Sequence, residues 1–254
     1  MREYRNIEDE NASKSMMQAI HYWINYTCKV SKIDLLVESS IRFPLMEYVE
    51  RYLHADNCYI ERQYADFLKE SIFKTPRYVD VMWEKKDTEY LLEIKYLRSS
   101  TNQENERQRF FDDLVRLSIA LNLKKEKQRK CYFLVCGNSC DFGEQMCGYL
   151  NRGDNYGGNL IGSMSDETIN TDFSNWLALD EHNTSENKIK HIEYDNEKER
   201  FSEFAERYFG AERISSADQN YHNKYLFPFY TKQIWLSYKN DEKMTGLWEV
   251  LLME

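Results

Sequence analysis

The sequence predicts an α/β fold of the α+β kind, with a central mixed sheet flanked by helices. Three consecutive segments predict it. Residues 77–97 resemble two strands joined by a tight turn, residues 104–125 have the periodicity of an amphipathic helix, and residues 130–137 form a short apolar run that ends in glycine. Because a strand reached through a helical crossover runs parallel to its neighbour, we expect a sheet that combines antiparallel and parallel pairs.

Two helices are expected before the sheet. Residues 1–14 are polar and acidic, and residues 15–30 carry apolar side chains near helical spacing, which predicts an N-terminal accessory helix. Within residues 31–53, the apolar side chains that fall on one helical stripe are Ile41, Leu45, Val49 and Tyr52. We therefore expect a second helix that buries this stripe.

Glu38 continues the buried stripe of the second helix, because it lies three residues before Ile41. A carboxylate aimed at the core is costly unless it has a partner or a metal ion, so Glu38 is a candidate functional residue. Pro44 leaves an alternative, since proline fits best in a first turn: the helix could begin near Ser40 and leave Glu38 in the preceding turn. Glu38 could also simply pair with Arg42, four residues on.

The hairpin at residues 77–97 follows a strand that we expect at residues 58–67. If Lys86 and Asp87 form a two-residue turn, one face of the hairpin is apolar. The pairs on that face are Val79 with Ile94, Val81 with Leu92, and Trp83 with Tyr90.

The other face of the hairpin carries charge. The same register places Asp80 opposite Glu93, and Lys95 follows Glu93 on that face. Like charges directly opposite one another destabilise a sheet, so this pair needs a positive charge between its members. A divalent cation held by carboxylate oxygens supplies it. A register slip of one residue would break the pairing, and the alternative is a surface hairpin with cross-strand ion pairs.

The helix at residues 104–125 has an apolar stripe and a charged face. The stripe consists of Phe110, Leu114, Leu117 and Leu121. Two oppositely charged pairs, each four residues apart, can bridge a solvated face: Arg109 with Asp113, and Asp112 with Arg116. Gln108 and Arg116 could instead reach phosphate or metal-bound water.

The C-terminal part predicts a helix at residues 196–210 and a closing pair of strands at residues 225–237 and 246–253. It could extend the sheet, bind DNA or form a dimer. We therefore divide the chain into three parts: an accessory helix at 1–30, a core at 31–137, and a C-terminal extension at 138–254 that packs on or extends the core.

Net charge and hydropathy limit the class of protein. The formal net charge of −9 argues against a nucleic-acid coat protein, which needs broad positive charge, but it permits a nuclease with an acidic metal site and a local basic patch. Basic residues recur around the hairpin, and Arg77 and Arg98 are candidates for nucleic-acid contact. Because the chain has neither a signal peptide nor the roughly 20 consecutive apolar residues of a membrane span, we expect a cytoplasmic protein without membrane contact.

The expected elements follow one another as helix, three strands, helix and strand. Asp80 lies on the second strand, and Glu-Ile-Lys follows thirteen residues later on the third. This pattern resembles the PD-(D/E)XK nuclease superfamily over roughly residues 31–137. The resemblance implies a restriction endonuclease-like αβββαβ core, with the C-terminal extension outside it. One departure is that Val79, where the family often has proline, precedes Asp80.

The resemblance also implies roles for individual residues. Asp80 and Glu93 would bind Mg²⁺, with Mn²⁺ as a substitute, aided by the main-chain carbonyl of Ile94. Lys95 would orient or help to deprotonate the attacking water. Glu38 would match the acidic residue that the family often places on its first helix.

The expected function is therefore metal-dependent endonucleolytic hydrolysis of DNA, with RNA not excluded, in a restriction or antiphage context. Cleavage of both strands normally requires two active sites, so a homodimer is an option. One alternative is a catalytically inactive binding or scaffold subunit of a larger complex. Another is an acidic inhibitor that mimics DNA, which the basic residues around the hairpin disfavour.

Overall fold

The computed structural model describes the following residues: 7–30, 36–97, 103–123, 127–138, 141, 189–192, 198–209, 225–237 and 243–253. Its helices are α1 (Ile7–Lys29), α2 (Glu38–Arg51), α3 (Tyr64–Leu68), α4 (Gln103–Asn122) and α7 (Lys198–Tyr208). Its strands are β1 (Asn57–Gln63), β2 (Tyr78–Lys85), β3 (Thr88–Leu97), β4 (Gln128–Asn138), β5 (Ile189–Ile192), β6 (Phe229–Leu236) and β7 (Lys243–Leu252).

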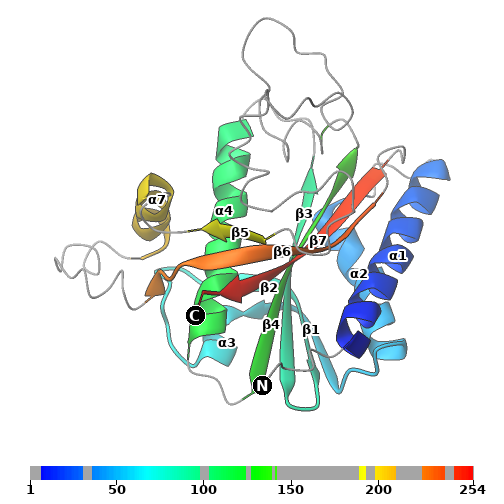
Figure 1. Cartoon of the computed structure of the whole chain (residues 1–254), viewed down its shortest axis with the longest axis horizontal. Coiled ribbons are helices and arrows are strands. Elements are labelled where there is room, and N and C mark those ends of the chain that lie inside the picture. The colour runs from blue at the N-terminus through cyan, green and yellow to red at the C-terminus, as the bar shows by residue number, and fades with distance from the viewer. Residues whose placement is uncertain are drawn as a thin grey trace, which may run out of the picture.

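The strands form one seven-stranded sheet in the order β1-β2-β3-β4-β7-β6-β5 (Figure 1). Neighbouring strands are antiparallel, except that β4 runs parallel to β3. The chain reaches β4 through α4, as a parallel connection requires. The predicted mixed sheet flanked by helices is therefore confirmed.

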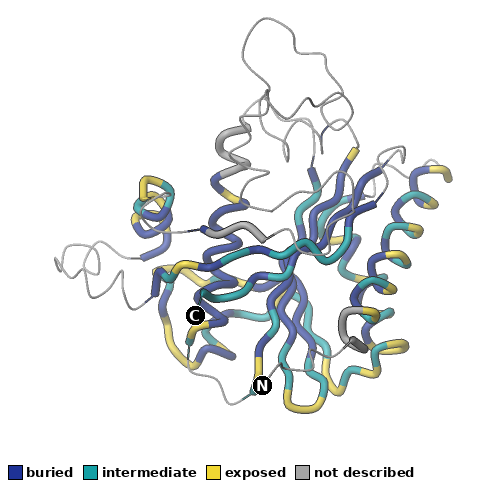
Figure 2. The backbone as a smooth tube through the Cα atoms, in the orientation of Figure 1, coloured by how far each residue is buried: buried dark blue, intermediate teal, exposed yellow. Residues whose placement is uncertain are grey.

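Helices cover both faces of the sheet, with α1 and α2 on one face and α4 and α7 on the other (Figure 1). Each face has its own cluster of buried apolar side chains, so the middle strands are dark along most of their length in Figure 2. Burial on both faces explains why β4 reads as a continuous apolar run rather than an alternating one.

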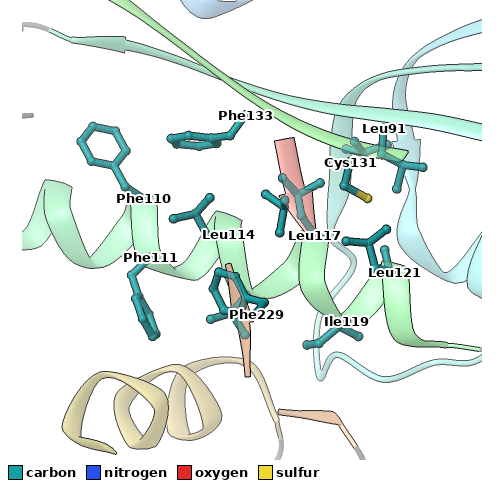
Figure 3. Close-up of a cluster of buried hydrophobic side chains, with 14 of the residues drawn as sticks. Leu91, Phe110, Phe111, Leu114, Leu117, Ile119, Leu121, Cys131, Phe133 and Phe229 are labelled. Carbon is teal, nitrogen blue, oxygen red and sulfur yellow. The ribbon is translucent and has the colours of Figure 1, made fainter. Parts of the chain in front are cut away.

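The helix α4 is buried on nearly all sides from Phe110 to Leu121. Figure 3 shows Phe110 on the side of the helix that faces Phe133 of β4, whereas Phe111 points toward α7. The ring of Phe111 meets that of Phe201 on α7 edge to face, with 5.0 Å between centroids. The predicted stripe of α4 is thus correct but describes only one of two apolar faces.

The C-terminal strands extend the sheet, which was one of the three alternatives for that part of the chain. β7 pairs with β4 from Cys131 and Val250 to Asn138 and Lys243, and β6 pairs with the far side of β7. The buried face of α7 is the predicted one, formed by Phe201, Phe204, Ala205 and Tyr208.

Several predicted boundaries are wrong. The helix α1 begins at Ile7 rather than near residue 15, because Glu8, Glu10 and Ala12 in the polar start are themselves good helix formers. The strand expected at residues 58–67 ends at Gln63, and the chain turns there into α3, whose apolar side chains enter the core. No helix within the described residues is both long and apolar enough to cross a membrane.

Candidate functional site

The hairpin has the predicted turn and only part of the predicted register. Strand β2 ends at Lys85 and β3 begins at Thr88, which leaves Lys86 and Asp87 as the turn. The pairing of Val81 with Leu92 and of Trp83 with Tyr90 is confirmed. The ladder between the two strands starts at Val81 and Leu92, however, and does not include the expected pairs of Val79 with Ile94 and Asp80 with Glu93.

Asp80 lies at a break in the regular sheet. On its other side, the ladder with β1 joins Arg62 to Val79 and Ile60 to Val81, and passes over Glu61. Val79 packs on the α4 side of the sheet and Val81 on the α2 side, so the alternation of faces is interrupted between them. The expectation that Val79 and Ile94 share one apolar face is wrong for this reason.

The side chain of Asp80 bridges the sheet and α2. Its Oδ2 accepts a hydrogen bond from the main-chain N–H of Ile94 at 2.7 Å, and its Oδ1 accepts one from Nη2 of Arg42. Where the ladder between β2 and β3 is interrupted, the carboxylate of Asp80 therefore accepts the hydrogen bond of a β3 main-chain N–H.

Glu93 is buried on the α4 side of β3, with 2% of the residue exposed. Its Oε1 accepts a hydrogen bond from the Tyr64 hydroxyl at 2.9 Å and lies 3.6 Å from Nη2 of Arg116. Burial raises the pKa of Glu93 well above its ordinary value, and the charges of Asp80 and Asp113 add to the rise. Arg116 opposes the rise without cancelling it.

Lys95 is held between two carboxylates. Its Nζ lies 2.8 Å from Oδ2 of Asp113 on α4 and 3.8 Å from Oε1 of Glu38. Burial by itself would lower the pKa of Lys95, but the attraction of Asp113 and Glu38 outweighs burial and raises it. Lys95 therefore stays charged at neutral pH.

Glu38 is the first residue of α2, so the helix includes it and contains Pro44 in its interior. The alternative start near Ser40 is wrong. Oε1 of Glu38 accepts the N–H of Tyr96 at 3.3 Å, which ties the start of α2 to β3. Burial raises the pKa of Glu38, Lys95 opposes the rise, and Asp80 adds to it. The side chain remains 39% exposed and is the part of the site that is open to solvent.

The structure thus brings together all four residues that were predicted to be catalytic. We call the ionic cluster the set of four carboxylates Glu38, Asp80, Glu93 and Asp113 with the three cations Arg42, Lys95 and Arg116. Helices α2 and α4 and strands β2 and β3 contribute its members, so it forms only when both faces of the sheet are covered.

Three members of the ionic cluster were misjudged from the sequence. The helical pattern favours a solvated face for Asp113 and Arg116, with contact to phosphate or metal-bound water as the alternative for Arg116. Both residues are instead buried, and they pair with each other as well as with Lys95 and Glu93. Arg42 was considered only as a partner of Glu38. The sequence does contain a signal that Asp113 and Arg116 are buried. A second apolar stripe of α4, which consists of Phe111, Val115 and Ile119, indicates a helix that is covered on two sides.

The residues proposed to contact nucleic acid make internal contacts. Gln108 is buried, and its Nε2 donates to Asp112 at 2.9 Å and to the carbonyl of Arg200 at 3.3 Å. The guanidinium of Arg77 stacks on the ring of Tyr208 at 4.5 Å. Arg98 lies outside the described residues. Nucleic-acid contact by these residues stays a prediction, and for Gln108 and Arg116 it requires the present contacts to open.

The donor chemistry of the ionic cluster fits Mg²⁺ or Mn²⁺, since carboxylate oxygens are the ligands that hard divalent cations prefer. The arrangement is nevertheless that of ion pairs. Within the described part of the chain, no group of three or more His, Cys, Asp and Glu side chains is arranged to hold a metal ion. Arg42 on Asp80 and Arg116 on Glu93 place protein cations where a metal ion would have to bind.

No family model, curated protein or solved structure matches this chain. What the ionic cluster can do therefore follows from its own geometry. It combines buried carboxylates that can bind a cation, a lysine that stays charged, and a partly exposed glutamate with a raised pKa.

Proposed function

We propose that this protein is a metal-dependent endonuclease that hydrolyses DNA phosphodiester bonds, with Mg²⁺ as its cofactor and Mn²⁺ as a substitute. The observation that carries the proposal is the convergence of Glu38, Asp80, Glu93 and Lys95, which are scattered over 58 residues, in one largely buried cluster that is open to solvent at Glu38. Mg²⁺ in phosphoryl-transfer sites is usually bound by one or two carboxylates together with substrate phosphate oxygens.

A restriction endonuclease-like core is the fold that we propose for this site. The order α2, β1, α3, β2, β3, α4 and β4 supports that assignment: three antiparallel strands, with the short helix α3 after the first, are followed by a parallel one. The point where β2 and β3 separate brings together Glu38 of α2, Asp80 of β2 and the Glu-Ile-Lys segment of β3. That fold would need its acidic and basic side chains at this point.

Asp80 and Glu93 would hold the metal ion together with the carbonyl of Ile94. The ion would supply polarisation of the phosphate and activation of water. Lys95 would stabilise negative charge on the phosphate rather than remove a proton, because Asp113 keeps it charged. Glu38 would accept a proton from the attacking water and release it to solvent, because it is partly exposed and its pKa is raised.

Cleavage of plasmid and linear DNA with Mg²⁺ or Mn²⁺ tests this proposal. We expect Asp80→Ala and Lys95→Ala each to lower the cleavage rate by more than about 100-fold, since each removes several kcal/mol of charge stabilisation from the transition state. Glu47→Ala is the matched control, because Glu47 lies on α2 with its side chain 59% exposed and pairs only locally with Arg51 in the described ion pairs. Equal cleavage activity in the wild type and all variants would contradict the proposal. An RNA substrate tested in parallel shows whether the enzyme cleaves DNA or RNA.

A second candidate is a catalytically inactive binding or scaffold subunit. The pairing of Arg42 with Asp80 and of Arg116 with Glu93 favours it, since a cluster neutralised by its own cations needs no metal to be stable. If the wild-type protein neither cleaves nucleic acid nor binds Mn²⁺, the binding or scaffold function is favoured over the nuclease.

A further inference from the structure

Arg42 holds the Asp80 end of the ionic cluster. Its Nη2 donates to Oδ1 of Asp80, and its Nη1 donates to Oε1 of Glu61 on β1. The side chains of Arg42 and Asp80 are each only 12% exposed, whereas that of Glu61 is 60% exposed. One guanidinium therefore bridges a buried carboxylate and a solvated one.

The backbone of β1 is shaped around this bridge. Glu61 has φ of 52°, a left-handed conformation that is unusual for a residue with a side chain, and it lies where the ladder between β1 and β2 is interrupted. Regular alternation would place Glu61 on the same side of β1 as Tyr59, which packs against the α4-side cluster. Its carboxylate instead meets Arg42 on α2, on the opposite face.

Both oxygens of Asp80 are engaged, but by different kinds of donor. The N–H of Ile94 belongs to the fixed main chain of β3, whereas Arg42 reaches Asp80 with a long side chain that has a second, solvent-facing anchor. Arg116, the other arginine of the ionic cluster, differs because its second partner is the buried Asp113. Arg42 is thus the arginine of the ionic cluster that can leave its buried carboxylate and keep a partner at the protein surface, because the side chain of Glu61 is 60% exposed.

We propose that Arg42 is an internal competitor for the metal ion: it occupies Asp80 until a divalent cation displaces it, and Glu61 then retains the guanidinium. The inference rests on the proposed metal site, and it names the residue that controls metal affinity there. An arginine does not lose its proton in proteins, so a cation can reach Oδ1 of Asp80 only by moving Arg42 and not by neutralising it. Metal affinity then depends on the difference in free energy between two positions of the Arg42 side chain, one on Asp80 and one on Glu61 alone.

Calorimetric titration of the full chain with Mn²⁺ alone, without nucleic acid, tests the inference. We expect Arg42→Gln to bind Mn²⁺ at least about tenfold more tightly than the wild type, because the variant removes a charged hydrogen-bond partner of Asp80. Arg51→Gln on the same helix should bind like the wild type, since Arg51 is 71% exposed and pairs with Glu47. Asp80→Asn should lose the binding.

Two further variants probe the bridge itself. Arg42→Lys keeps the charge but cannot engage both carboxylates with a planar fork, so its Mn²⁺ affinity should lie between those of wild type and Arg42→Gln. Glu61→Gln removes the anchor that retains the displaced guanidinium, so it should bind Mn²⁺ several-fold more weakly than wild type. The pair also keeps the test open if Arg42→Gln does not fold.

The outcomes separate this inference from the proposed function. Tighter Mn²⁺ binding by Arg42→Gln in a protein that cleaves no nucleic acid would support the inference and refute the nuclease. Wild-type cleavage together with an unchanged or weaker Mn²⁺ affinity in Arg42→Gln would overturn the inference and leave the nuclease standing. Absence of Mn²⁺ binding in every variant would overturn both.

Discussion

At the residue scale, Glu93 shows how burial and charge compete in the ionic cluster. It is nearly inaccessible, it has the Tyr64 hydroxyl as a donor at 2.9 Å, and Arg116 lies 3.6 Å away. These partners do not compensate for the loss of water, so the pKa of Glu93 remains well above its ordinary value of 4.5. Ionisation of Glu93 is therefore less favourable in the folded protein than in the unfolded chain.

This imbalance predicts a pH dependence of stability. A carboxyl group whose pKa is raised in the folded state contributes stability that is complete below the unfolded pKa and lost as the pH rises through the folded pKa. The unfolding free energy of the wild type relative to Glu93→Gln should therefore increase as the pH falls through the raised folded pKa toward the ordinary value of 4.5, by up to about 1.4 kcal/mol per pH unit. Urea denaturation of both proteins at each pH measures the difference, and a constant difference would contradict the assignment.

At the element scale, α4 connects the ionic cluster to the C-terminal part of the chain. Its Asp113 faces Lys95, and the preceding residue, Asp112, faces α7. Asp112 is fully buried and accepts hydrogen bonds from Gln108 at 2.9 Å, from Tyr208 at 2.9 Å, and from Arg207. Adjacent carboxylates on one helix thus serve two different interfaces.

The contact of α4 with α7 predicts a large effect of Asp112→Ala. The substitution leaves the buried Tyr208 hydroxyl without its acceptor and the Gln108 amide with only the carbonyl of Arg200, so it should lower the unfolding free energy by about 2–4 kcal/mol. Glu47→Ala, which removes an exposed carboxylate from α2, should cost less than about 1 kcal/mol. Chemical denaturation compares the two variants, and similar small losses would show that Asp112 does not anchor α7.

At the scale of the whole molecule, the N-terminal and C-terminal strands belong to one sheet. β4 pairs with β3 on one side and with β7 on the other. Trp248 on β7 is fully buried in the same apolar cluster as Phe110 and Phe111 of α4. The C-terminal strands therefore complete the core that the first part of the chain begins.

This continuity predicts cooperative unfolding. The amides of β3 and β7 should exchange with deuterium through the same global opening, with equal opening free energies that fall in parallel as urea is added. Hydrogen exchange followed by mass spectrometry of peptides from the two strands measures both values. A lower opening free energy confined to β6 and β7 would show that the C-terminal extension unfolds separately.

The sequence alone determined those features that depend on near neighbours along the chain. The order of the helices and strands apart from α3 and β5, the turn at Lys86 and Asp87, the pairing of Val81 with Leu92 and the buried face of α7 were all predictable. Periodicity and turn chemistry act over a few residues, and a hairpin fixes its register through its turn.

Only the tertiary structure decided which charges meet. Arg42 pairs with Asp80, 38 positions away, rather than with Glu38 one helical turn before it. Asp113 became the partner of Lys95 because α4 is buried on both faces, which its single predicted stripe did not reveal. Ion pairing depends on distance in space and on local burial, and both are set by how α2 and α4 pack on opposite faces of the sheet.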